Sequence, residues 1–192
     1  MLSGTMAWRI GGSGSRGVDG AGPHALEPGI FFGKGFGDLP DSLAWLRPIG
    51  IAGAISMEFP LSPTSTILGI VSGTRRLGPV LGRNVDTLHW GIAIEYSTYY
   101  LTSRFTGAPP KEEPLNQLVP LIEFNFDSPV GQKTAATMNP GLAYVGQTYQ
   151  VAVLAIVPLN TEAGRGVGVR TQLLLFLDDL VPSVFGKPLL SP

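Results

Sequence analysis

The sequence offers few side chains that could do chemistry, and most of them stand alone among small residues. Its 192 residues include 13 Lys or Arg and 14 Asp or Glu, and no cysteine. Without cysteine there is no disulfide, no thiolate metal site and no thiol nucleophile. Glu123 and Asp127 are candidates for an acid–base pair, but four residues along one strand separate them by about 13 Å, too far for a glycosidase pair.

Glycine-rich and histidine-containing segments do not complete a catalytic motif either. Residues 12–17 match the dinucleotide-binding pattern G-x-G-x-x-G, yet residues 18–23 cannot form the helix whose N-terminus would hold the pyrophosphate. His24 and His89 are far apart, without metalloprotease spacing around either. His89 lies beside Trp90 at a strand end, where a membrane-interface position accounts for it without a metal. We therefore expect no enzymatic activity, no cofactor and no metal site.

Composition narrows the class of protein further. Charged residues make up 14% of the chain, against about 25% in a typical soluble domain, while 44% are hydrophobic, which argues against disorder. The formal net charge of -1 gives no electrostatic basis for a nucleic-acid partner. No apolar stretch reaches the roughly 18–20 residues of a membrane-spanning helix. No secretory signal is visible in the first twelve residues, so we expect the protein either to stay inside the cell or to begin after such a signal.

Alternation of apolar and small residues, the signal of a β-strand, recurs along the chain. It predicts about eight strands within a single domain, residues 1–192, with a tail at 182–192. The five clearest strands span residues 2–10, 49–59, 89–100, 118–127 and 167–178, and three weaker ones span 29–37, 137–146 and 148–159. One short helix is expected at 41–46, with Asp41 or Ser42 as its N-cap. Loops are expected at 11–28, 61–86 and 103–116, a tight turn at Gly146-Gln147 and a longer hairpin loop at 160–166.

Most predicted strands have an apolar face of large residues and a small-residue face of Gly, Ala and Ser with isolated polar groups, whereas the strand at 148–159 is apolar on both faces. Aromatic residues lie near the strand ends on the apolar face, as in the belt of a membrane barrel: Trp8, Phe59, Trp90, Tyr96, Tyr100 and Phe126. The polar groups of the small-residue face are predicted to point into a lumen: Arg9, Glu58, Glu95, Glu123, Asn125, Asp127, Gln150, Arg170 and Gln172. A soluble protein usually covers its wet face with Lys, Glu, Thr and Asp instead.

These faces favour an all-β, antiparallel up-and-down transmembrane β-barrel with membrane lipid as its surroundings. A strand of ten residues spans about 33 Å, or about 24 Å of height when tilted by 45°, which matches the apolar band of such barrels. Two interpretations of the lumen charges stay open: they pair and fill a narrow interior, or they line a pore. A soluble, lipocalin-like barrel that binds an apolar ligand inside remains a further alternative.

Three segments resemble a group of proteobacterial outer-membrane proteins similar to the meta-pathway phenol-degradation barrels. They are Phe31–Leu43, Asn139–Gln150 and Val157–Val169, the last with the ending Phe176–Pro182. The resemblance implies the outer membrane of a Gram-negative bacterium and passage or binding of small, hydrophobic or aromatic molecules. It also implies a signal peptide and further N-terminal strands, so that this sequence would be the C-terminal part of a longer barrel. A non-transporting barrel, as an oligomer or a component of a larger assembly, is the alternative function.

Overall fold

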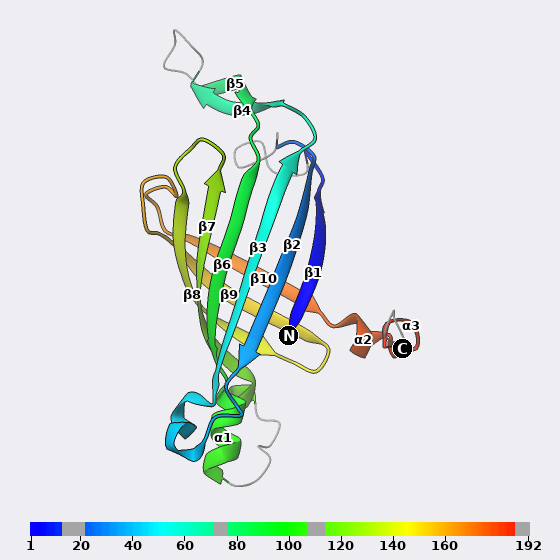
Figure 1. Ribbon diagram of the computed structural model, residues 1–192, viewed down its shortest axis with the longest axis vertical. Helices are drawn as coiled ribbons and strands as arrows, with labels where there is room; N and C mark the ends of the chain where they lie inside the picture. Colours follow the sequence, from blue (N-terminus) through cyan, green and yellow to red (C-terminus); the bar gives the residue numbers. More distant parts are fainter. Residues whose placement is uncertain (13–21, 71–76, 107–113, 187–192) are drawn as a thin grey trace. The chain divides into compact units, whose positions relative to one another are not determined.

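The computed structural model describes residues 1–12, 22–70, 77–106 and 114–186 and is an all-β structure with short helices (Figure 1). Eight strands form one antiparallel sheet in the order β1-β2-β3-β6-β7-β8-β9-β10, and β4 and β5 form a separate two-stranded sheet. The eight strands are β1 (Leu2–Arg9), β2 (Ala25–Gly35), β3 (Ile49–Pro60), β6 (Thr87–Tyr96), β7 (Leu118–Pro129), β8 (Ala135–Val145), β9 (Tyr149–Pro158) and β10 (Gly168–Leu175). Sequential strands are neighbours throughout, which is the up-and-down order of a β-barrel.

Helices are confined to the connections and to the C-terminal side. They comprise the 3-10 helices η1 (Asp41–Leu46) and η2 (Pro114–Gln117), and the helices α1 (Thr98–Thr106), α2 (Leu177–Leu180) and α3 (Pro182–Phe185). Among the described residues, none of these helices has the length and hydropathy needed to cross a bilayer. The strands β3, β7 and β9 each end at a proline, which has no N–H to continue the ladder.

The chain folds into two compact units. Unit 1 comprises residues 1–32, 53–91 and 125–135, and unit 2 comprises residues 33–52, 92–124 and 136–192. Several long strands contribute one part to each unit. Each hydrogen bond and ion pair described in the next subsection joins two residues of the same unit.

The eight predicted strands are confirmed, with shifts of a few residues at their ends, as are the turn after Val145 and the hairpin loop after β9. The predicted loop at 61–86 is wrong in part, because β4 (Thr64–Ile70) and β5 (Leu77–Arg83) pair there as a hairpin. The predicted loop at 11–28 gives way to β2 from Ala25 onward, and most of residues 12–17 lie outside the described residues. At 103–116, α1 and η2 flank residues 107–113, which also lie outside them.

Two helix boundaries also differ from the prediction. The strand predicted to reach Tyr100 ends at Tyr96, because the Tyr100 amide donates to Ser97 Oγ at 3.2 Å and starts α1. The helix at 41–46 is present, but its N-cap residue is Pro40 and no side chain caps it, so neither Asp41 nor Ser42 is the cap.

The most closely packed part of unit 2 lies where β8 and β9 pair. Ala143, Ala152 and Leu154 are almost completely buried and contact the half-buried Val119 and Leu121 of β7. Leu154 lies directly opposite Gly141, and a Cβ on Gly141 would approach Leu154 Cγ and the Val153 carbonyl oxygen to 2.6 Å. A glycine at position 141 therefore lets the two backbones meet while the Leu154 side chain covers it.

We expect Gly141→Val to destabilise the sheet by about 1–3 kcal/mol, since overpacking at this site displaces backbone rather than a flexible side chain. The matched control is Gly4→Val on β1, where an added Cβ meets nothing within 4 Å. Urea unfolding of the purified protein in detergent micelles measures both variants. Equal midpoints for the two variants would contradict close packing between β8 and β9.

Candidate functional site

On the central strand β6 and on β9, exposed apolar residues alternate with less exposed ones. On β6, Trp90, Ile92 and Ile94 are each about 40% exposed, at 43%, 42% and 39%. On β9 the exposed Val151 and Val153 alternate with Ala152 and Leu154, which are 1% and 0% exposed. β6 therefore exposes its larger apolar side chains, whereas β9 exposes Val151 and Val153 and covers the larger Leu154.

The predicted aromatic residues lie mainly on this exposed face. Trp8, Phe59 and Trp90 are exposed, at 63%, 42% and 43%. Phe126 of β7 stacks on Trp90 of β6, with 3.9 Å between ring centroids and 11° between ring planes. Tyr96 is the last residue of β6, but Tyr100 is not on a strand: it lies in α1, and its hydroxyl donates to the Gly37 carbonyl at 3.4 Å.

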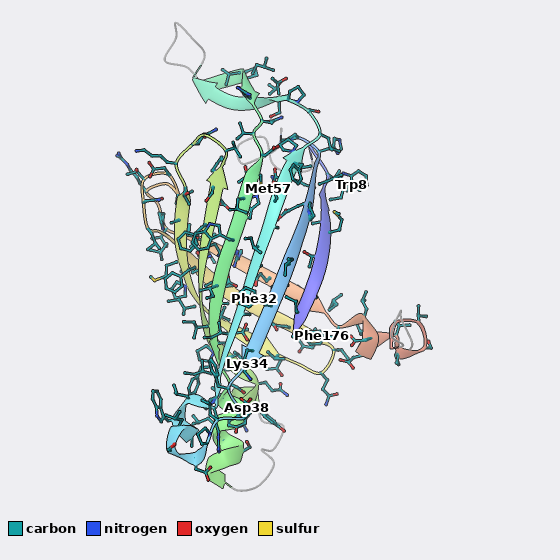
Figure 2. All side chains as sticks on the ribbon, viewed as in Figure 1. Trp8, Phe32, Lys34, Asp38, Met57 and Phe176 are labelled. Carbon is teal, nitrogen blue, oxygen red and sulfur yellow. The ribbon has the colours of Figure 1, made fainter. Side chains whose placement is uncertain are left out.

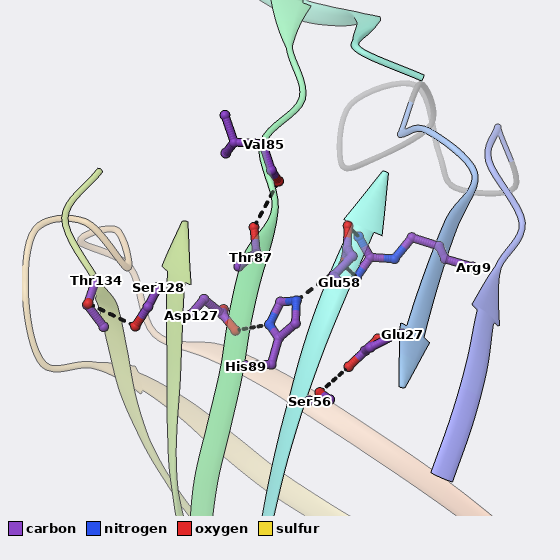
Figure 3. Close-up of polar contacts among 10 residues, drawn as sticks. All are labelled: Arg9, Glu27, Ser56, Glu58, Val85, Thr87, His89, Asp127, Ser128 and Thr134. Carbon is purple, nitrogen blue, oxygen red and sulfur yellow. Dashed lines mark hydrogen bonds and ion pairs between the residues drawn. The ribbon is translucent and has the colours of Figure 1, made fainter. Parts of the chain in front are cut away.

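Four titratable residues of unit 1 form a chain of polar contacts, here called the His89 cluster: Arg9, Glu58, His89 and Asp127 (Figure 3). Arg9 Nη1 and Nη2 donate to the two carboxylate oxygens of Glu58 at 2.9 and 2.7 Å. His89 Nε2 lies 3.2 Å from Glu58 Oε2, and His89 Nδ1 lies 2.6 Å from Asp127 Oδ1. Glu58 is only 6% exposed, so it is the buried centre of the cluster.

The strand order explains why these four residues meet. Arg9 ends β1, Glu58 lies near the end of β3, His89 near the start of β6 and Asp127 near the end of β7. Because neighbouring antiparallel strands bring the end of one beside the start of the next, β3, β6 and β7 place their groups at one level. Arg9 comes from β1, which is not a neighbour of β3, so its long side chain must reach past β2.

Both nitrogens of the His89 ring are hydrogen-bonded to carboxylates. A neutral imidazole carries one N–H and donates only once, whereas the imidazolium donates from both nitrogens. The geometry therefore suits the positively charged ring, which balances Glu58 and Asp127 together with Arg9. The two ring nitrogens point away from each other toward different carboxylates, and the described residues hold no group of three or more side chains arranged for a metal ion.

A neighbouring contact extends the polar face of unit 1. Ser56 Oγ on β3 donates to Glu27 Oε1 on β2 (Figure 3). The nearby Gly29 is needed for close packing, because a Cβ there would lie 2.8 Å from Ser56 Cβ and 2.9 Å from Thr5 Oγ1. Neither Glu27 nor Ser56 was predicted as a site residue. Ser56 lies two residues before Glu58 on one predicted strand, and this spacing was the available signal for it. Glu27 lies in the segment predicted as a loop and had no such signal.

Unit 2 contains a second polar group around an ion pair between Arg170 of β10 and Glu123 of β7. A hollow of about 70 Å³ lies beside this pair. Its polar lining consists of Glu95, Glu123, Gln150 and Gln172, and its apolar lining of Val119, Leu121, Ala143, Val145 and Ala152. A water molecule occupies about 30 Å³ in the liquid and organic ligands need about 300 Å³ or more, so this hollow suits water only.

The structure thus divides the predicted polar set between the two units. In unit 1, Arg9 pairs with Glu58, and His89 links Glu58 to Asp127, which was not predicted. In unit 2 the hollow is lined by four predicted residues, Glu95, Glu123, Gln150 and Gln172, and Arg170 pairs with Glu123. Asn125 is half-buried on β7, midway in sequence between Glu123 and Asp127. The membrane-interface position predicted for His89 did not include its two carboxylate partners, Glu58 and Asp127, which lie 31 and 38 residues away in sequence.

An exposed ion pair outside both groups gives a useful comparison. Lys34 Nζ lies 2.9 Å from Asp38 Oδ2 at the turn after β2, and both side chains are about two-thirds exposed, at 65% and 68% (Figure 2). The hydrogen bond from Lys34 lowers the pKa of Asp38 below its usual value.

Comparison of the chain with models of protein families, with curated proteins and with solved structures finds no match.

Proposed function

We propose that this chain forms the wall of a β-barrel in the outer membrane of a Gram-negative bacterium, through which small hydrophobic or aromatic molecules pass or to which they bind. The observation that carries the proposal is the orientation of the faces. Large apolar residues such as Ile92 and Val153 are exposed, while Glu58, Ala143 and Ala152 are buried. A soluble barrel has the opposite orientation, with its apolar side chains inside.

The resemblance of segments 31–43, 139–150 and 157–169 to outer-membrane barrels of the phenol-degradation type supports the same membrane and class of molecule. The polar groups of the small-residue face then belong to the lumen. These polar groups carry more acidic than basic side chains: four are acidic (Glu58, Glu95, Glu123 and Asp127) and three are basic (Arg9, Arg170 and His89). Such a lumen favours cations modestly.

A structural barrel that transports nothing is the second candidate. It is favoured by the pairing of Arg9 with Glu58 and of Arg170 with Glu123, and by the small hollow of about 70 Å³ beside the second pair. Paired charges that fill an interior leave no path for a solute.

Conductance of the purified protein in planar lipid bilayers distinguishes the two candidates. We expect discrete conductance steps with weak cation selectivity. Glu95→Lys should reduce or invert this selectivity, because Glu95 lines the hollow, whereas Asp38→Lys at the exposed turn should leave it unchanged. Electrically silent bilayers, together with no thermal protection of the protein by small aromatic compounds, would refute transport and leave the structural barrel.

A further inference from the structure

The His89 cluster holds one imidazole ring between two carboxylates that differ in their access to water (Figure 3). The side chain of Glu58 is 7% exposed, whereas that of Asp127 is 59% exposed. Glu58 also accepts hydrogen bonds from both terminal nitrogens of Arg9, at 2.9 and 2.7 Å. Asp127 joins the cluster through His89 Nδ1 at 2.6 Å. The two carboxylates are therefore not equivalent partners for the ring.

The number of protons on the ring decides how many carboxylates His89 can bind. Histidine ordinarily titrates between pH 5 and 8, where carboxylates are ionised. The imidazolium donates from both ring nitrogens, whereas the neutral ring donates from one and carries a lone pair on the other. A lone pair directed at a carboxylate oxygen is repulsive, so loss of the proton ends one of the two hydrogen bonds. With the proton, His89 links β6 to both of its neighbours, β3 and β7, and without it only to one of them.

Access to water determines which hydrogen bond is lost. Removing a hydrogen bond from a buried carboxylate leaves its desolvation uncompensated, whereas an exposed carboxylate exchanges its protein partner for water. Asp127 can turn toward water, because more than half of its side chain is already exposed. Glu58 cannot do so, since its side chain is almost completely buried. The neutral ring therefore keeps its proton on Nε2, toward Glu58.

The other charged groups around the ring keep their charge over the same pH range. Arg9 from β1 is always protonated, and the carboxylates of Glu58 on β3 and Asp127 on β7 are ionised. Glu27 on β2 acts on the ring through its charge and is ionised as well. Within the His89 cluster two cations and two anions balance while the ring is protonated. Loss of the ring proton leaves one negative charge in excess.

We propose that His89 is a proton-dependent link between strands: the protonated ring ties β6 to β3 and β7, and the neutral ring keeps Glu58 and releases Asp127. The consequence for transport rests on the barrel function proposed above. In that barrel the released carboxylate adds an unpaired negative charge to the lumen, and such charge attracts cations. Cation selectivity therefore increases as the pH rises through the titration of the ring.

Double-mutant cycles at two pH values test the link without any measurement of transport. One cycle combines His89→Gln with Asp127→Asn, the other combines His89→Gln with Glu58→Gln, and urea unfolding in detergent micelles gives the coupling in each. At about pH 5.5, where the ring is protonated, we expect coupling in both cycles. At about pH 9, the coupling to Asp127 should be lost and the coupling to Glu58 should persist.

The second histidine of the chain provides the matched control. His24 is exposed and accepts a hydrogen bond from the Gly11 amide, so a cycle of His24→Gln with Asp127→Asn should show no coupling at either pH. Coupling of His89 to Asp127 that is equal at both pH values would overturn the proposed release. So would a coupling to Glu58 that disappears in place of it, or the absence of coupling in both His89 cycles.

The reversal potential in planar bilayers under a KCl gradient tests the consequence for transport. We expect cation selectivity to rise between about pH 5.5 and pH 9 for the unmodified protein and for His24→Gln. His89→Gln should lose most of this rise, and an equal rise in that variant would refute control of selectivity by His89. Electrically silent bilayers, together with the expected loss of coupling to Asp127, would refute the proposed transport and leave the proton-dependent link established.

Discussion

Replacing Glu58 by alanine should lower the free energy of unfolding by about 2–3 kcal/mol, since it removes the shared partner of Arg9 and His89. The side chains left behind are 42% and 26% exposed, so water compensates part of the loss. The measurement is the urea midpoint in detergent micelles, followed by near-ultraviolet circular dichroism. Glu58→Gln keeps the shape of the side chain and separates lost charge from lost packing.

The control for this prediction is Asp38→Ala, which breaks the exposed ion pair with Lys34 and should leave the midpoint unchanged. A second check is the double variant Arg9→Ala/Glu58→Ala, whose effect should be smaller than the sum of the two single effects. If Glu58→Ala and Asp38→Ala shift the midpoint equally, the His89 cluster does not stabilise unit 1.

An arginine at position 92 should destabilise the membrane-inserted protein by about 2–4 kcal/mol, the cost of a cation near the middle of a lipid-facing strand. Ile92 lies near the centre of β6 and is 42% exposed on the apolar face. Unfolding in lipid vesicles measures the change.

Leu81→Arg is the matched control, because Leu81 is 75% exposed but lies on β5, outside the eight-stranded sheet. It should have no measurable effect. A neutral result for both variants would place the apolar face of β6 in water and refute the membrane location.

Alternation was sufficient to predict five of the eight main strands clearly, because a half-covered strand shows a period of two. It failed where the period continues past the strand. Thr98 and Tyr100 extend the alternation of β6, yet Ser97 accepts the Tyr100 amide and turns the chain into α1. The β4–β5 hairpin was missed because its segment, rich in glycine and proline, lacks a clear apolar face.

The polar clusters could be predicted only in part. The periodicity places Arg9, Glu58 and Asp127 on small-residue faces, but which carboxylate each cation meets depends on strand order and register. For His89 the sequence shows only an aromatic neighbour, Trp90. Its contacts with Glu58 and Asp127 arise because the start of β6 lies beside the ends of its two neighbours, β3 and β7.

The His89 cluster also has a consequence for the order in which the chain folds. Arg9 and Glu58 are 49 residues apart in sequence, and His89 lies 31 residues after Glu58 and 38 residues before Asp127. Contacts across such distances form only after the loss of chain entropy in closing long loops, which slows folding of β-rich topologies. Arg9 on β1 therefore finds its carboxylate partner only after β3 has been made and has joined the sheet, although β1 itself pairs with the next strand, β2. The Arg9–Glu58 contact thus belongs to the late steps of folding.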